Sequence, residues 1–117
     1  MSKVSYLVEL TINEGKLEAF KEFAESASRT VHDGEPGTLD YQWRIGEDGT
    51  RCLLTEGFES SEALLIHLGN IGPILPDLLE LAPITRFEVM GSVNDEARAA
   101  LDGLGAKHFP NFAGFTR

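Results

Sequence analysis

The feature that most constrains the fold is a repeated change in the spacing of the apolar residues. In residues 4–12 they fall at every second position, which is typical of a strand with one buried face. In residues 17–31 they fall at steps of three and four, which predicts a helix with a single apolar stripe. A chain that changes period in this way is expected to pack helices against a sheet.

The same two patterns return in the middle of the chain. Residues 39–45 alternate between apolar and polar side chains, and residues 51–58 form a second strand-like run after a tight turn. The turn ends in Asp48-Gly49, a strong hairpin signal. Ser60 or Ser61 then caps a second helix.

The second helix is interrupted by glycine and proline. The helix is expected to weaken at Gly69 and to break at Gly72-Pro73. A short helical segment is expected to begin again at Pro76, since proline suits a first helical turn. Residues 84–93 predict a fourth strand, and Asn94 is placed to cap a final helix.

The boundaries of the first helix are also marked. Asn13 is the predicted N-cap, with Glu14 close to the positive end of the helix. Gly34 is suited to close the helix, and Pro36 disfavours helical geometry at Glu35.

The predicted order is β-α-β-β-α-β, the ferredoxin-like split βαβ arrangement of the α+β class. Residues 1–93 form this domain, with two helices on one face of a four-stranded antiparallel sheet. Residues 94–117 add a helix and an aromatic tail with Phe109, Phe112 and Phe115. Because exposed phenylalanines forgo burial energy, this extension is expected to pack on the same domain or on a partner.

Both faces of the predicted sheet are partly apolar. Leu7 lies between Tyr6 and Val8, and Leu53 and Leu54 are neighbours although successive strand residues point to opposite faces. The face without helices therefore needs a cover. A second copy of the chain is the simplest one, which predicts a homodimer.

Charge and composition exclude several classes of partner. Acidic residues outnumber basic ones nineteen to ten, giving a net charge of −9, so nucleic acid and anionic membranes are not expected partners. The single cysteine, Cys52, cannot form an internal disulfide, and no Cys/His spacing suggests a zinc site. No run approaches the about 20 apolar residues of a membrane span, so a cytoplasmic protein is expected.

Three segments resemble a known family. E-P-G-T-L-D-Y-Q-W at 35–43, T-E-G-F-E-S-S-E-A-L-L-I-H at 55–67 and F-E-V-M-G at 87–91 are similar to the antibiotic biosynthesis monooxygenase family. The resemblance implies a dimeric α+β barrel with a cavity between sheet and helices in each subunit. It also implies oxygenation of quinols or phenols without metal or flavin, so no cofactor is expected.

Such chemistry needs a base, hydrogen-bond donors and aromatic walls in a dry pocket, because the electron-rich substrate anion itself activates oxygen. His67 is the candidate base, since imidazole titrates near neutral pH. Tyr41 and Trp43 are the candidate walls and donors on one strand face. The sequence leaves open whether that face meets the helices or a partner subunit.

The remaining candidates are for substrate binding. They are Tyr6, Arg44, Glu56 and Phe58. Glu56 is expected to be paired, with Arg44 or Arg86 as its partner. The functional reading is a small aromatic quinol or phenol as substrate, and a non-catalytic, ligand-binding barrel is the alternative.

Haem binding through His67 is a distant third reading. The haem-degrading branch of the family carries a tryptophan near the end of the third strand and an asparagine in the first. Here the third strand ends Glu56-Gly57-Phe58, and no asparagine occurs between Val4 and Ile12.

Overall fold

The computed structural model of this protein describes residues 3–117. Its elements are, in order, β1 (Val4–Thr11), α1 (Leu17–Gly34), β2 (Thr38–Ile45), β3 (Arg51–Phe58), α2 (Ser61–Ile71), a 3₁₀ turn η1 (Gly72–Ile74), α3 (Leu75–Leu81), β4 (Ile84–Met90), α4 (Asp95–Asp102) and β5 (Lys107–Phe109). The predicted α+β arrangement is confirmed.

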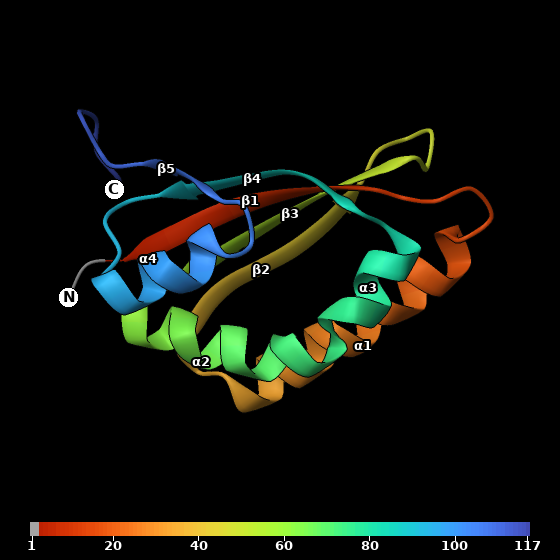
Figure 1. The fold of residues 1–117 in the computed structure, drawn as a ribbon, viewed down its shortest axis with the longest axis horizontal. Helices are drawn as coiled ribbons and strands as arrows, with labels where there is room; N and C mark the ends of the chain where they lie inside the picture. Colours follow the sequence, from red (N-terminus) through yellow and green to blue (C-terminus); the bar gives the residue numbers. More distant parts are fainter. Residues whose placement is uncertain (1–2) are drawn as a thin grey trace.

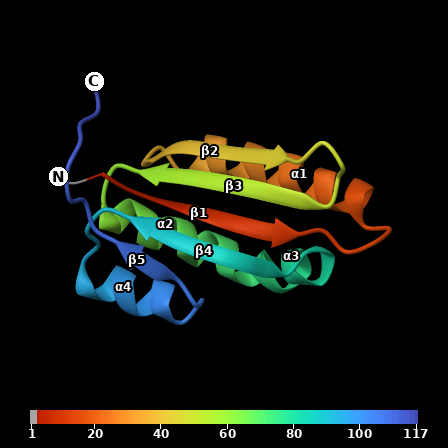
Figure 2. The ribbon, with the colours of Figure 1, turned by 90° about the horizontal axis from the view of Figure 1, so that it is seen from above.

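The strands form one sheet in the order β2-β3-β1-β4-β5. Helices α1, α2 and α3 lie beneath one face of it, as Figure 1 shows, and the view from above in Figure 2 shows the other face without a cover. The first four strands pair antiparallel, but β5 pairs parallel with β4. The prediction of a four-stranded, purely antiparallel sheet is therefore wrong, because it missed the short parallel strand β5. Within the single chain the sheet is open and does not close into a barrel.

The core lies between this sheet and the helices. Every second residue of β1 is buried, as the alternation predicted. Leu10 from β1, Phe20 from α1 and Leu64 from α2 have no exposed surface. Burying each such side chain contributes about 1.5–3 kcal/mol. This apolar layer holds the sheet and the helices together around the polar site.

The segment before α1 differs from its prediction. The helix begins at Leu17, without a side-chain cap. The amide of Asn13 instead donates to the carbonyl of Glu80 at 2.9 Å, and its backbone N–H donates to Leu81 at 2.9 Å. Asn13 thus ties the end of β1 to the end of α3, a contact between segments distant in the sequence.

The other two predicted caps are confirmed. The Ser60 hydroxyl accepts the N–H of Ala63 at 3.1 Å, and the Asn94 side chain accepts that of Ala97 at 2.8 Å. The first of these caps starts the helix that carries His67. The fourth strand, predicted to reach residue 93, ends at Met90.

The helical segment Ser61–Leu81 is long and apolar enough to cross a membrane by length and composition, with a mean hydropathy of 1.2. The sequence reading did not expect such a segment. In the structure η1 divides it, and it covers the sheet with Leu64, His67 and Leu78 buried against the strands. Only 17% of the apolar window is buried, however, and Ile66 is 59% exposed.

The uncovered face of the sheet carries exposed apolar side chains. Leu39, Leu53 and Met90 are 52%, 41% and 38% exposed. A bulge in β2 between Thr38 and Asp40 removes Leu39 from the alternation that the sequence suggested.

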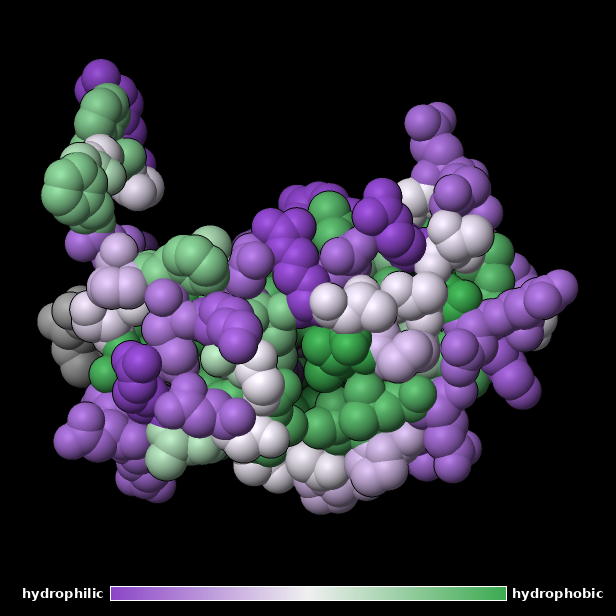
Figure 3. Space-filling model, turned by 45° about the horizontal axis from the view of Figure 1, so that its top comes forward, coloured by the Kyte–Doolittle hydropathy of each residue, from purple (hydrophilic) through white to green (hydrophobic). Residues whose placement is uncertain are grey.

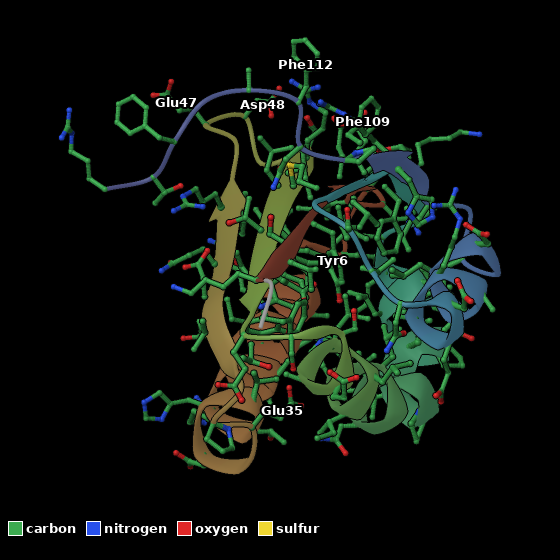
Figure 4. All side chains as sticks on the ribbon, turned by 90° about the vertical axis from the view of Figure 1, so that its left-hand side faces the viewer. Tyr6, Glu35, Glu47, Asp48, Phe109 and Phe112 are labelled. Carbon is green, nitrogen blue, oxygen red and sulfur yellow. The ribbon has the colours of Figure 1, made fainter. Side chains whose placement is uncertain are left out.

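The tail rises on the same side of the sheet after β5, and two of its aromatic rings are left exposed. Phe112 is fully exposed and Phe115 is 80% exposed, and Figure 4 shows Phe112 at the far edge of the molecule. Packing on the same domain is thus not observed for these two rings. Packing on a partner stays a prediction.

Candidate functional site

A cavity opens between the sheet and helices α2 and α3. Its volume is about 40 Å³, within about 480 Å³ of space between atoms that includes open solvent, and Figure 3 shows hydrophobic side chains gathered around a hollow on this side. The lining is apolar except for five side chains, which are Tyr6, Tyr41, Trp43, Glu56 and His67. The structure thus answers the question left open by the sequence: Tyr41 and Trp43 face the helices and share a cavity with His67.

Three of these side chains form a row across neighbouring strands. Tyr6 on β1 lies directly opposite Glu56 on β3, and Glu56 lies opposite Tyr41 on β2. Directly paired residues of antiparallel strands point to the same face. The row therefore projects as one unit toward α2, where His67 meets it.

Glu56 is a buried carboxylate, with 3% of its surface exposed. The Tyr6 hydroxyl donates to its Oε1 at 2.9 Å, and His67 Nε2 lies 2.8 Å from the same oxygen. Both of these bonds end on Oε1, and Oε2 takes part in neither of them.

His67 is bound at both ring nitrogens. Its Nδ1 lies 2.8 Å from Glu35 Oε1 and its Nε2 lies 2.8 Å from Glu56 Oε1, and only 2% of the residue is exposed. Burial lowers the pKa of His67, but the bonds and charges of Glu56 and Glu35 outweigh it and raise that pKa above its usual range. An imidazolium that donates to both carboxylates fits these distances.

The sequence reading missed Glu35, which it treated as the end of a helix. Glu35 is 4% exposed, and its carboxylate accepts bonds from Thr38 at 2.8 Å and from Asn70 at 3.0 Å besides that of His67. Figure 4 places it below the row that contains Tyr6. The only signal in the sequence was an acid held between a helix end and Pro36.

Two donors that belong to lining residues of the cavity have no hydrogen-bond partner among the described residues. These are the Tyr41 hydroxyl and the Trp43 indole N–H, whose atoms are fully buried. Burial, followed by the charge of Glu56, raises the pKa of the Tyr41 hydroxyl far above its usual range, while the nearby N–H of Trp43 acts in the opposite direction. Tyr41 therefore stays protonated. Buried donors of this kind are costly unless a ligand accepts from them.

Aromatic rings hold these groups in place. The Tyr41 ring lies 5.5 Å from the His67 ring and 5.8 Å from the Trp43 ring, measured between centroids, and both pairs are close to edge-on. Trp43 also packs edge-on against Phe20 of α1 at 5.6 Å. Such pairs restrict the rotamers of the donors, so their direction is set before a ligand enters.

Two of the predicted substrate-binding residues do not line the cavity. Arg44 points to the opposite face of β2, where it donates to Thr55 at 2.9 Å. Phe58 is buried behind the site, with its ring 5.5 Å from that of His67. The predicted arginine partners of Glu56 are also wrong, because the carboxylate pairs with His67 and Arg86 pairs with Glu88 at 2.8 Å.

The described residues contain no group of three or more His, Cys, Asp and Glu side chains placed to hold a metal ion. His67 also offers no free nitrogen to an iron atom, since both ring nitrogens face carboxylates. The arrangement suits proton transfer. It combines a buried carboxylate with a bound imidazolium and two unpartnered donors.

Comparison with known proteins agrees with this description. The sequence profile of the family described as "Antibiotic biosynthesis monooxygenase" matches residues 4–71. A search of curated proteins finds no match.

Several solved structures share the fold. MupZ from Pseudomonas fluorescens is 28% identical with a TM-score of 0.89, and the match covers 100% of this chain and 96% of MupZ. Rv0793 from Mycobacterium tuberculosis is 20% identical with a TM-score of 0.66, over 80% of this chain and 98% of that one. A conserved protein from Methanosarcina mazei is 17% identical with a TM-score of 0.65, over 76% and 89% of the two chains.

Proposed function

The chain belongs to the antibiotic biosynthesis monooxygenase family, and from this premise we propose that its cavity oxygenates a small aromatic phenol or quinol without a cofactor. The observation that carries the proposal is that Glu56, Tyr41 and Trp43 line one largely apolar cavity, in which the Tyr41 hydroxyl and the Trp43 N–H have no partner among the described residues. The apolar walls suit a flat, uncharged ring. The three polar groups suit its oxygen.

The first step is removal of the phenolic proton. The substrate O–H donates to Glu56 Oε2, the proton passes to that oxygen, and the phenolate oxygen accepts bonds from Tyr41 and Trp43. Donors already fixed where negative charge develops stabilise an anion far more than water-exposed ones. Glu56 is thus the proposed base, which moves this role from His67, the candidate of the sequence reading.

The second step uses the phenolate as the reductant. It passes one electron to dioxygen, and the two radicals combine at a ring carbon to give a peroxide anion. Proton return from Glu56 and loss of water then leave a quinone. The balance is one phenol and one O₂ to one quinone and one water, so no external electron donor is consumed.

The role proposed for His67 is to hold and tune Glu56. Its Nε2–H fixes Oε1, so that Oε2 faces the cavity. Its positive charge offsets the cost of burying two neighbouring carboxylates, because buried charges need a partner.

The direct experiment measures oxygen uptake with a panel of hydroquinones and phenols. Wild-type protein and Glu22→Gln, which alters an exposed glutamate of α1, are expected to consume oxygen and form quinone. Glu56→Gln is expected to lose about 100-fold or more in rate. Product formed with no uptake of oxygen would overturn oxygenation, and unchanged uptake in Glu56→Gln would overturn the role of Glu56.

The second candidate is a ligand-binding protein without turnover. It is favoured by the large apolar share of the lining, ten of whose fifteen residues are hydrophobic side chains other than Tyr and Trp. Binding of hydroquinones by calorimetry, with neither uptake of oxygen nor change in the ligand, would establish it.

We also propose that two copies associate through the uncovered face of the sheet. Leu39, Leu53 and Met90 are exposed there, and the C-terminal tail, in which Phe112 and Phe115 are exposed, extends on the same side. Their burial at about 25 cal/mol per Å² of apolar surface supports association. The expected product is a homodimer in which the two sheets close a barrel.

A further inference from the structure

The two buried carboxylates that flank His67 lie on two different cavities. Glu56 lines the inner cavity described above. Glu35 lines a separate groove on the surface, formed by the end of α1, the start of β2 and the start of α2. His67 stands between them, 2.8 Å from each.

We propose that Glu56, His67 and Glu35 form a proton route from the inner cavity to the surface groove, so that a proton taken from the substrate leaves the protein on the side away from the substrate. This inference rests on the proposed function, because it takes Glu56 as the base. Glu35 is then a positioning and proton-exit residue, since it does not touch the substrate.

The route offers a path for the proton away from the apolar mouth of the cavity. The half-buried residues of the cavity lining include the apolar side chains Ile71, Leu75 and Leu104, and also Tyr41 and Trp43, which line a second, open groove beside α1. A bound aromatic ring would fill the apolar mouth. His67 and Glu35 then give the proton a path on the other side of Glu56.

The step balances without a change in total charge. At rest His67 carries a proton on each ring nitrogen and donates one to each carboxylate. When the substrate proton arrives on Glu56 Oε2, the Nδ1 proton of His67 passes to Glu35 Oε1 and from there to water in the groove. One proton enters and one leaves, and no heavy atom moves.

The other titratable groups facing this row do not compete for the proton. Burial and the neighbouring charge of Glu56 raise the pKa of the Tyr6 hydroxyl on β1 well above its usual range. Tyr41 from β2 is held protonated in the same way. Thr38 and Asn70 donate to Glu35 and keep its carboxylate turned toward His67.

The test follows both ends of the route at once. Protein and para-nitrophenol are mixed rapidly without oxygen, in weak buffer at a pH where the free probe is mostly neutral. Its phenolate is coloured and reports proton removal in the cavity. A pH indicator absorbing at longer wavelength reports proton release to the solution.

In wild type and in Glu22→Gln, both signals are expected to rise together. In Glu35→Gln the phenolate is expected to form, but proton release should be about 100-fold slower, because an amide cannot take up the proton. His67→Gln interrupts the same route one residue earlier and should show the same delay, which keeps the test decisive if Glu35→Gln does not fold.

The opposite outcomes separate the two proposals. Release as fast as in wild type in Glu35→Gln or His67→Gln overturns the route and leaves the proposed function standing. Phenolate formed by Glu56→Gln to the wild-type extent, or no binding of the probe, overturns the proposed function itself.

Discussion

Replacing Tyr41 by Phe is expected to stabilise the protein and to impair its ligand site. The Tyr41 hydroxyl is fully buried and has no partner among residues 3–117. An unsatisfied buried polar group costs about 1–3 kcal/mol, so its removal should raise the free energy of unfolding by about this amount. Few substitutions in a core act in this direction.

The assay is urea unfolding followed by circular dichroism, with and without a hydroquinone. In its absence Tyr41→Phe should exceed wild type. A ligand at 100 times its dissociation constant adds about 2.7 kcal/mol to the stability of wild type. The variant should gain clearly less, because the substrate oxygen has lost a donor.

Tyr6→Phe is the matched control, since it removes a hydroxyl from the neighbouring strand of the same core. That hydroxyl donates to Glu56 at 2.9 Å, and losing a bond to a charged group costs about 1.5–3 kcal/mol. The two substitutions should therefore shift stability in opposite directions. Equal destabilisation by both would refute the reasoning, because it would show that the Tyr41 hydroxyl is already satisfied.

Three further predictions concern charge, space and association. The stability lost in His67→Gln should become smaller as pH rises. The pKa of His67 is raised in the folded protein, so the protonated ring contributes fully below the unfolded pKa of about 6.5, and its contribution is lost as pH rises through the folded pKa. A stability loss that grows from pH 6 to pH 9 would contradict this prediction. Gly37→Ala should lower the free energy of unfolding by about 1–3 kcal/mol, because a Cβ at residue 37 would lie 2.7 Å from the Cβ of Ala63. Gly69→Ala has open space around it and should raise the free energy of unfolding by about 0.5–1 kcal/mol. Equal effects in thermal unfolding would refute the packing argument. Deleting residues 110–117 should change the unfolding of an isolated subunit by less than about 0.5 kcal/mol but weaken association in analytical ultracentrifugation, and an unchanged dimer would exclude the tail from the interface.

The parts of the fold that depend on near neighbours were predictable from the sequence. The Ser60 and Asn94 caps are local, and their hydrogen bonds close within three residues. Asn13 had the same local signal but was drawn into contacts with the end of α3. Strand β5 has three residues and pairs parallel to β4, so it carries too short a pattern to detect.

The site was also predicted only in part, because sequence patterns report near neighbours and not contacts between distant segments. Alternation placed Tyr41 and Trp43 on one strand face, and helical spacing turned His67 inward, but neither pattern says which face meets which helix. Glu35 was missed because its burial depends on His67, which lies 32 residues away. The base was therefore assigned to the imidazole, both of whose nitrogens face carboxylates in the structure.

The most direct test is a crystal structure of the protein soaked with a hydroquinone under exclusion of oxygen. The ring is expected in the apolar cavity, with one of its oxygens within hydrogen-bond distance of Glu56 Oε2 and of the Tyr41 hydroxyl. A ring bound elsewhere, or one whose oxygens both point away from Glu56 toward solvent, would contradict the proposed chemistry.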